Sequence, residues 1–293
     1  MRAGSALMKV GGTFVVVQDD ACFLGRVDGS GAVACLPLPS PVEGVRLYDD
    51  LRGNKAKKLD LEAAVAIRDP KVPTSIRVFA FGSGSTRARE KIVTVRGVET
   101  GSPEVRMIDA SDLYASMRAR RDFTGDELNV EGTALFGDDL WFFQRGNGAG
   151  VAIDATGSVP VAVFLRWIDG EGPCPTLDHV TAWDLGEAAG VRLTFTDGCR
   201  DVRNRLAFLA AAEASPDATR DGPVAGVAMG LIDPIAGDAV FGDVRDERGA
   251  PLTDKAEGLA FDEDGNAWAV VDKDDPDAPA DLLELALDEG WRA

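Results

Sequence analysis

The sequence contains a single histidine, His179, among its 293 residues, and this scarcity excludes whole classes of site. Zinc or iron sites built from several histidines are excluded, and a serine–histidine–aspartate triad would have to use His179. His179 lies in TLDHVTAWDLG, an alternating stretch typical of a strand, where an ordinary structural role is the simpler interpretation. Carboxylate and metal chemistry is therefore the catalytic style that the composition best supports.

Cysteines are also few. Cys22, Cys35, Cys174 and Cys199 are widely spaced and form no CxxC pair, which argues against a zinc ribbon or a redox dithiol. Because a free cysteine behaves as a small hydrophobic residue, we expect four buried, unreactive thiols.

Positive charge and long apolar runs are likewise in short supply. The 31 Lys and Arg residues face 49 Asp and Glu residues, and the resulting net charge of −18 repels nucleic acid and anionic membranes. No stretch approaches the roughly 18 apolar residues of a membrane span, and the first 20 residues lack a signal-peptide pattern. With 45% hydrophobic residues the chain can bury a large core. We expect a cytoplasmic protein that binds neither nucleic acid nor membrane.

A hairpin pattern recurs along the whole chain. Each copy has a small residue, Glu-Gly or Glu-Ala, then an apolar strand, a turn, a second apolar strand and a polar end. The copies span residues 4–20, 61–85, 128–147, 189–215 (the weakest) and 256–275. Corresponding glutamates are Glu62, Glu131 and Glu257, which recur at intervals of roughly one or two such units. The sequence is therefore built from repeats.

The repeats predict an all-β protein. Further strand-like runs, among them VPVAVFLRW (159–167), lie between the hairpins, so each unit has two to four strands. Units of this size repeated radially are the blades of a β-propeller. We predict five blades, or six if the long second unit holds another, in a single domain over residues 1–293. A short surface helix is expected near 110–122, capped by Asp109 or Ser111. A β-sandwich followed by a second domain would not explain hairpins spread along the whole chain.

The polar ends of the hairpins are expected to meet. In an antiparallel hairpin the first strand starts at the same end of the ladder at which the second strand stops. If the first strand is innermost in each blade, these ends form a charged ring at one mouth of the central channel. Its members would be Asp19, Asp20, Glu62, Glu131, Arg145, Asn147, Glu213, Glu257, Asp272 and Asp274.

Carboxylates that converge in a partly dry funnel must bind protons, pair with basic groups or coordinate a cation. Oxygen ligands suit Ca²⁺, Mg²⁺ or Mn²⁺, with Ca²⁺ the first expectation. The predicted metal ligands are Asp19, Asp20, Glu62, Glu131, Glu257, Asp272 and Asp274. The alternative is structural: each glutamate accepts hydrogen bonds from a neighbouring blade, with Arg145 or Lys58 as its partner.

A glycine-rich loop, FGSGSTRARE (81–90), offers a separate hypothesis. Its backbone N–H groups could form an anion nest that Arg87 and Arg89 complete. It is not a P-loop, because a strand rather than a helix follows it. The alternative is a plain loop between strands.

Several of these segments carry a family resemblance. DLEAAVAI with FGSGST, LNVEGTALFGDDLWFFQRGN, FLAAAEAS and KAEGLAFDEDGNAWAVVDKDD resemble an uncharacterised bacterial β-propeller family related to the phytase-like or esterase-like propeller proteins. The resemblance implies a site at the channel mouth, calcium-dependent in some relatives, that acts on phosphate esters or related small molecules. The matching positions are Glu62, Glu131, Arg145, Glu257 and Asp272. The pattern is broken at Gly190 in the fourth repeat and at Gly4-Ser5 in the first.

The functional expectation is a divalent-metal-dependent hydrolase of phosphoesters, esters or lactones. Glu131 or Glu257 would accept the proton and Arg145 would stabilise the developing anion. Arg145, Asn147, Arg87 and Glu213 would contact a small polar or phosphorylated substrate. The alternative is a non-catalytic propeller that binds a small polar ligand or a partner protein at the same mouth. Pairing of Lys58, Arg145 and Arg203 with the carboxylates would leave little charge for a metal and would favour this alternative.

Overall fold

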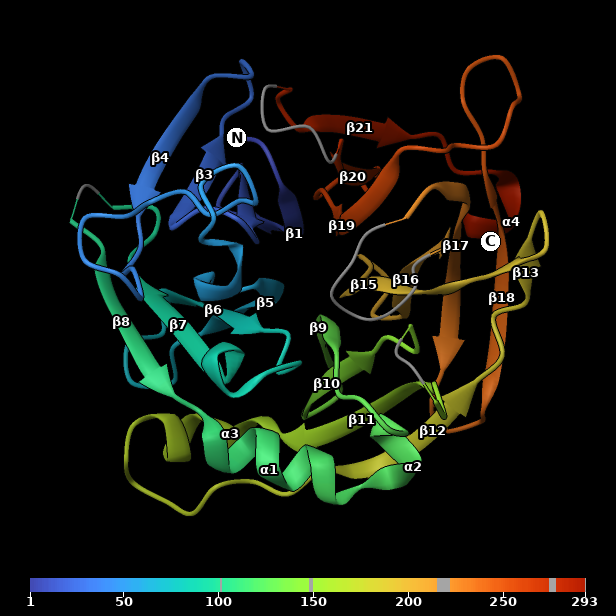
Figure 1. The fold of residues 1–293 in the computed structure, drawn as a ribbon. Coiled ribbons are helices and arrows are strands. Elements are labelled where there is room, and N and C mark those ends of the chain that lie inside the picture. Colours follow the sequence, from blue (N-terminus) through green and yellow to red (C-terminus); the bar gives the residue numbers. More distant parts are fainter. Residues whose placement is uncertain (101, 148–149, 215–221, 274–277, 293) are drawn as a thin grey trace.

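Five antiparallel sheets stand around a central axis, which confirms the predicted five-bladed propeller (Figure 1). The computed structural model describes residues 1–100, 102–147, 150–214, 222–273 and 278–292. Within each blade the strands pair in chain order, and the first strand is innermost. The five predicted hairpins are the two inner strands of the five blades.

The strands are assigned to the blades as follows. Blade 1 contains β1 (Gly4–Val10), β2 (Thr13–Gln18), β3 (Phe23–Val27) and β4 (Val33–Pro37). Blade 2 contains β5 (Leu61–Arg68), β6 (Ile76–Gly82), β7 (Lys91–Arg96) and β8 (Glu104–Asp109). Blade 3 contains β9 (Val130–Phe136), β10 (Asp139–Gln144), β11 (Asp154–Pro160) and β12 (Asp178–Trp183). Blade 4 contains β15 (Thr194–Arg200), β16 (Leu206–Glu213), β17 (Val224–Asp233) and β18 (Asp238–Val244). Blade 5 contains β19 (Lys255–Phe261), β20 (Ala267–Asp272) and β21 (Asp281–Leu285).

Short elements connect the blades. A two-stranded ribbon of β13 (Glu187–Ala188) and β14 (Val191–Arg192) precedes blade 4. The helices are α1 (Ser111–Ala119), α2 (Arg121–Thr124), α3 (Val161–Ile168) and α4 (Glu289–Arg292), with 3-10 turns η1 (Lys55–Lys57) and η2 (Arg87–Arg89). No helix in these described parts is long and apolar enough to cross a membrane.

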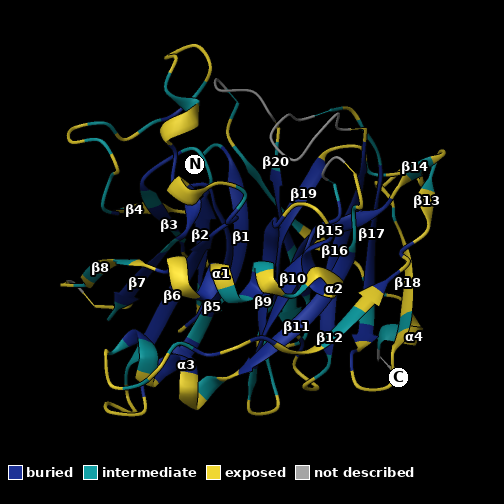
Figure 2. Ribbon diagram, turned by 60° about the horizontal axis from the view of Figure 1, so that its bottom comes forward, coloured by how far each residue is buried: buried dark blue, intermediate teal, exposed yellow. Residues whose placement is uncertain are grey.

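The hydrophobic core consists of layers between neighbouring blades. Alternate side chains of a strand point to opposite faces, so each blade presents apolar residues to both neighbours. Between blades 2 and 3, for example, the rings of Phe81 and Phe142 meet edge to face at 5.4 Å. Figure 2 shows the inner strands buried, whereas exposed residues gather in the loops and on the outer strands. The inner strands are therefore held rigidly around the channel.

Two local predictions need comparison with the structure. The helix expected near 110–122 is present as α1 and α2, but it is more than a surface element, because Leu113, Tyr114 and Met117 are buried and the Tyr114 hydroxyl donates to the Gly82 carbonyl. The strand predicted within 159–167 is wrong, because β11 ends at Pro160 and α3 follows it. A short apolar run fits either state by pattern, and proline suits the start of a helix.

The cysteine prediction holds only in part. All four thiols are free, but Cys35 is exposed and Cys174 and Cys199 are partly exposed, which leaves Cys22 as the buried one.

The ring closes without a shared sheet. Strand β1 packs against β19 and β20, and the Ala280 amide donates to the Met1 carbonyl at 3.1 Å. Blade 5 has three strands where the other blades have four. Among the described strands, none from the start of the chain joins the blade at its end.

Candidate functional site

Each inner strand carries a β-bulge near its start. The ladder register shifts at the same level in all five blades, and the extra residues are Ser5, Glu62, Glu131, Thr196 and Glu257. A bulge leaves one residue unpaired and redirects its side chain. The equivalence of Glu62, Glu131 and Glu257 is thus a real structural repeat. The fourth repeat has Thr196 at this level, not Gly190, which lies in the turn between β13 and β14.

The two hydroxyl residues of this set tie neighbouring blades together. The Ser5 hydroxyl donates to the Leu61 carbonyl at 2.5 Å, and the Thr196 hydroxyl donates to the Ala256 carbonyl at 2.7 Å. Leu61 and Ala256 directly precede Glu62 and Glu257. In blades 1 and 4 the side chain of the bulge residue therefore forms a hydrogen bond to the backbone of the next blade.

Two of the glutamates are followed by a glycine, and steric crowding explains why glycine is needed there. A Cβ at Gly132 would lie 2.5 Å from the Gly198 nitrogen, and one at Gly258 would lie 2.7 Å from the Leu7 nitrogen. Both positions sit where the backbone of one inner strand approaches that of the next blade, so a side chain would force the strands apart. The Glu-Gly pair thus combines a redirected carboxylate with close packing of the blades.

Side chains at this end of the channel form what we call the carboxylate mouth. Its members are Asp19, Lys58, Asp60, Glu62, Arg89, Glu131, Arg145, Glu213, Lys255 and Glu257. Asp19 is partly exposed and the others are buried. The structure therefore brings together six carboxylates and four cations from all five blades or the segments beside them.

On the blade 2 side, one lysine joins two aspartates. Lys58 forms ion pairs with Asp19 and, at 2.7 Å, with Asp60. Asp60 also pairs with Arg89 at 2.8 Å and accepts a hydrogen bond from Ser83. Two residues of the glycine-rich loop, Ser83 and Arg89, thus bind the carboxylate of Asp60. The anion nest predicted for this loop remains a prediction.

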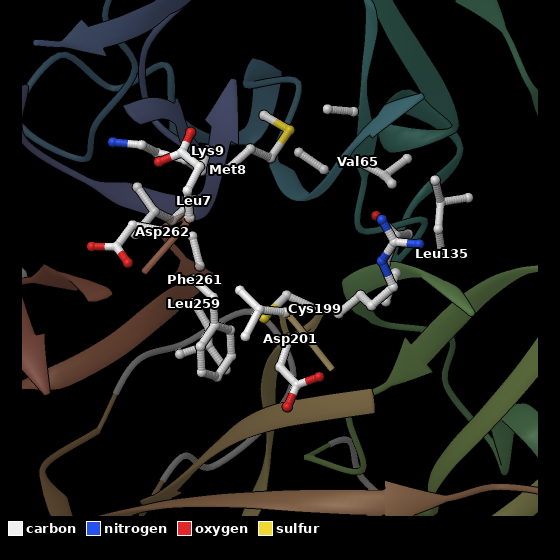
Figure 3. Close-up of a pocket in the computed structure, with 18 residues that line it drawn as sticks. Leu7, Met8, Lys9, Val65, Leu135, Cys199, Asp201, Leu259, Phe261 and Asp262 are labelled. Carbon is white, nitrogen blue, oxygen red and sulfur yellow. The ribbon is translucent and has the colours of Figure 1, made fainter. Parts of the chain in front are cut away.

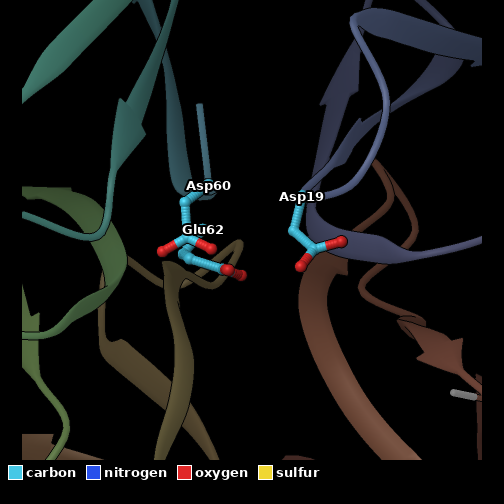
Figure 4. A group of neighbouring side chains, drawn as sticks. All are labelled: Asp19, Asp60 and Glu62. Carbon is cyan, nitrogen blue, oxygen red and sulfur yellow. The ribbon is translucent and has the colours of Figure 1, made fainter. Parts of the chain in front are cut away.

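Glu62 lies beside this cluster. Oxygen atoms of Asp19, Asp60 and Glu62 all lie within 4.8 Å of one another, and Figure 4 shows Asp19 facing the other two carboxylates. Among the described residues, Glu62 has neither a hydrogen bond nor an ion pair, although it is only 9% exposed. Burial raises its pKa well above the usual glutamate range, and the charges of Asp60 and Asp19 raise it further.

For the neighbouring Lys58 and Asp60, nearby charges outweigh burial and keep the charged form favoured. Burial alone would lower the pKa of Lys58, but the charges of Asp19, Asp60 and Glu62 outweigh it and raise that pKa well above normal. Burial would raise the pKa of Asp60, yet Lys58 and Arg89 hold it below the ordinary aspartate value. Glu62 feels the charge of Lys58 too, but burial and the two aspartates outweigh it, and Glu62 has no hydrogen bond or ion pair of its own among the described residues.

On the side of blades 3 to 5, Arg145 and Lys255 organise the glutamates. Arg145 lies 2.6 Å from Glu213 and 3.6 Å from Glu131, and its Nε donates to the Thr194 hydroxyl at 3.1 Å. Lys255 lies 2.6 Å from Glu257 and 3.4 Å from Glu213. Glu213 therefore sits between two cations.

The pKa values follow this arrangement. Burial would raise the pKa of Glu213, but Lys255 and Arg145 outweigh it and lower that pKa to about 2. For Glu257 and Glu131, burial dominates and raises the pKa despite Lys255 and Arg145. Burial would lower the pKa of Arg145, but Glu131 and Glu213 raise it overall, so this guanidinium stays charged.

The remaining predicted residues are spread around this mouth. Asp20 pairs with Arg2, which also reaches Asp49 at 3.2 Å. Asn147 accepts a hydrogen bond from Asn129 at 3.2 Å.

Asp272 lies near enough to Glu257 for its charge to raise that pKa. Arg87 is exposed in η2, and Asp274 lies outside the described residues. Arg203 follows β15, at the other end of that strand.

Sequence reasoning missed several charged members. Asp60 and Lys255 stand two residues before Glu62 and Glu257, and Asn129, which donates to Glu131 at 2.7 Å, stands two before that glutamate. A polar residue at this offset in DLE, NVE and KAE is the signal that could have found them.

Asp197 was also missed. Its carboxylate accepts hydrogen bonds from the amides of Gly198 and Leu259, each at 2.7 Å, and also bonds the Leu7 amide. Burial raises its pKa well above the aspartate range. Asp197 thus joins three consecutive blades, 4, 5 and 1, one residue along β15 from the bulge residue Thr196.

A protein-family model matches residues 1–287, which is nearly the whole chain. The chain belongs to DUF6929, a family of unknown function. Among curated proteins, none matches this DUF6929 sequence significantly.

Solved structures resemble this DUF6929 chain in fold. A candidate glycoside hydrolase from Parabacteroides distasonis has 9% identity and a TM-score of 0.51, over 98% of this chain and 87% of that one. A glucose dehydrogenase has 11% identity and a TM-score of 0.48, over 98% and 97%. A streptogramin B lyase has 14% identity and a TM-score of 0.39, over 92% and 90%. At such identities the likeness supports the propeller fold alone, and the phytase-like relation stays a prediction.

Proposed function

We propose that this protein binds a small polar molecule carrying a positively charged group at the carboxylate mouth. The observation that carries the proposal is Glu62, a buried carboxylate without a partner among the described residues, close to Asp19 and Asp60. A buried carboxylate is costly unless it is protonated or paired. An ammonium or guanidinium group would supply the missing partner.

The charge balance supports a cationic ligand. Six carboxylates of the mouth face four cations. Burial raises the pKa of three of these carboxylates, Glu62, Glu131 and Glu257, so a cationic ligand would bind by displacing protons from them, and up to two negative charges would then be available to it. Lys58 and Arg145 each pair with two carboxylates, as the binding alternative requires, whereas Arg203 lies at the other end of β15. The side chain of Asp19 is 16% exposed, so solvent reaches this edge of the cluster.

A divalent-metal-dependent hydrolase of phosphoesters, esters or lactones is the second candidate. It is favoured by the three carboxylates of Asp19, Asp60 and Glu62, whose oxygens suit a hard cation. When bound, such an ion would polarise a phosphoryl or carbonyl oxygen and acidify a bound water. Glu131 or Glu257 would then accept a proton, and Arg145 would stabilise an anion. The donor set fits only if Lys58 withdraws, because its ammonium already contacts two of the three carboxylates.

The names of the structural neighbours do not choose between these candidates. Hydrolase, lyase and dehydrogenase are different chemistries, and each belongs to the protein that bears the name.

Thermal unfolding distinguishes the two candidates, because a ligand that binds only the native state raises stability by RT ln(1 + [L]/Kd). Chelator-treated protein is heated with putrescine, with 1,4-butanediol as its neutral counterpart, and with Ca²⁺, Mg²⁺ or Mn²⁺. The same series is run on Glu62→Gln and on the control Glu263→Gln, an exposed position at the far end of β19.

We expect putrescine to raise Tm by several degrees in the wild type and in Glu263→Gln but not in Glu62→Gln, and butanediol to have no effect. A rise with a divalent cation alone would favour the hydrolase and direct a screen of phosphoesters and lactones. If neither class of cation shifts Tm, both candidates are rejected and the cluster is structural.

A further inference from the structure

The opposite end of the channel contains a second hollow, which we call the apolar mouth. It is lined by the later halves of the five inner strands and the turns that follow two of them, and its volume is about 320 Å³. Figure 3 shows side chains of β1, β5, β9, β15 and β19 around this open centre, including Leu7, Val65 and Leu259. Asp197 joins the inner strands of blades 4, 5 and 1 at a level between this mouth and the carboxylate mouth.

Three of the five charged residues at the rim of the apolar mouth are engaged in their own turns. Asp201 accepts hydrogen bonds from the Arg203 and Arg205 amides at 2.9 and 2.7 Å. Asp262 accepts from the Asn266 amide at 2.9 Å. Lys9 donates to the Gly12 carbonyl and lies 4.1 Å from the centre of a phenylalanine ring. These three groups are therefore not arranged to hold a charged ligand, and the other two charged residues, Arg200 and Glu263, are exposed to solvent at the rim.

The interior presents apolar groups and one free hydroxyl. Leucine, valine, alanine, methionine and phenylalanine side chains form most of the wall. Thr133 also lines the hollow, and its hydroxyl is buried with no hydrogen-bond partner among the described residues. Buried hydroxyls are normally satisfied. This one is closed to solvent, so a ligand in the hollow would have to displace the side chains that cover it in order to supply the missing oxygen.

We propose that the apolar mouth is a binding site for a small, largely apolar molecule with one hydroxyl or carbonyl group. Its volume is about twice that of a cavity that holds benzene, so it suits a ligand of roughly two fused rings. The volume also falls within the usual range for ligand pockets. This site is independent of the function proposed for the carboxylate mouth.

The probe is 2-naphthol, whose fluorescence reports transfer into an apolar site, with naphthalene as a competitor that lacks the hydroxyl. Titration of the wild type should show saturable binding. Ala66→Phe places a ring at a partly exposed position of the hollow and should weaken binding at least tenfold. Val202→Trp closes the exposed rim and serves the same purpose if Ala66→Phe unfolds. Glu62→Gln, at the other mouth, should bind as the wild type does.

Thr133→Val tests the hydrogen bond. The preference for 2-naphthol over naphthalene should fall about three- to tenfold in this variant, since a neutral hydrogen bond has that net worth. The site would be overturned if the wild type showed no saturable binding. It would also be overturned if Ala66→Phe and Val202→Trp both bound 2-naphthol as tightly as the wild type. An unchanged preference in Thr133→Val would overturn the role of its hydroxyl.

Discussion

Glu62 and Glu213 are equally buried, at 9% exposure each, and lie at the same mouth of one channel. Glu213 sits between Arg145 and Lys255 and has a pKa lowered to about 2, whereas Glu62 has no partner among the described residues and a raised pKa. Burial raises the pKa in both cases, so the two cations beside Glu213 account for the opposite direction of its pKa. Glu213 is held as a structural anion, and Glu62 is the carboxylate with which we propose that a ligand pairs.

Removing the cation on the Glu62 side should have the largest effect. Lys58→Met leaves the carboxylates of Asp19 and Asp60 without their shared ammonium, beside Glu62. We expect a loss of about 3–5 kcal/mol in the free energy of unfolding measured in urea, because breaking a buried ion pair leaves uncompensated charge. The exposed neighbour provides a control, Lys57→Met, which should change stability little. A loss below about 1 kcal/mol would show that the carboxylates are already protonated.

The second largest difference is expected when each of the two glutamates is replaced by glutamine, because the two replacements should affect stability differently. Glu213→Gln should cost about 3 kcal/mol, because its pKa of about 2 records that much favourable interaction of the charged form. Glu62→Gln should be neutral or slightly stabilising, since it removes a carboxylate that is unfavourable when charged. Equal effects in urea unfolding would remove the distinction between the two sides of the mouth.

Stability should depend on pH in opposite ways. The pKa of Glu213 is lowered by folding, so its contribution is present above the unfolded pKa of about 4.5 and is lost as pH falls toward about 2. The pKa values of Glu62 and Glu257 are raised, so their native forms hold protons that the unfolded chain releases, and stability falls as pH rises above about 4.5.

The test is the difference in unfolding free energy between Glu62→Gln and the wild type from pH 5 to 7. It should grow in favour of the variant, by at most about 1.4 kcal/mol per pH unit. A flat difference would mean that Glu62 is ionised throughout, and a difference of opposite sign would mean that it is paired as Glu213 is.

The smallest effect on stability is expected at Ser5, a bulge residue whose hydroxyl already has a hydrogen-bond partner. Ser5→Ala removes the hydrogen bond from blade 1 to the Leu61 carbonyl and should cost about 1 kcal/mol. Ser102→Ala, at an exposed position, is the matched control and should cost less than about 0.5 kcal/mol. A cost for Ser5→Ala no larger than that of the control would show that the hydroxyl does not help to join blades 1 and 2.

The sequence predicted most of the fold because propeller blades repeat local patterns. The hairpins and the equivalence of Glu62, Glu131 and Glu257 could be read directly. Thr196 was missed because β13 and β14 insert an extra turn before blade 4, which shifted the alignment to Gly190. α3 was missed because a short apolar run has no decisive period.

The charge pairing could not be read from sequence for a different reason. Lys58 reaches Asp19 across 39 positions, and Arg145 reaches Glu213 across 68, so both contacts depend on the closed ring. A single chain records which groups exist at the mouth but not which of them are neutralised. That balance decides whether Glu62 holds a proton, a ligand or a metal.

The closure between blades 5 and 1 has a consequence for how the molecule assembles. Every sheet is continuous in sequence, so each blade can form as soon as its own residues leave the ribosome, starting from the N-terminus. The junctions of blade 5 with blade 4 and with blade 1 must wait for the last blade. Until then the partners of Glu213 and Asp197 on blade 5, Lys255 and Leu259, are missing. Completion of the ring and the pairing of Glu213 with Lys255 are therefore one event.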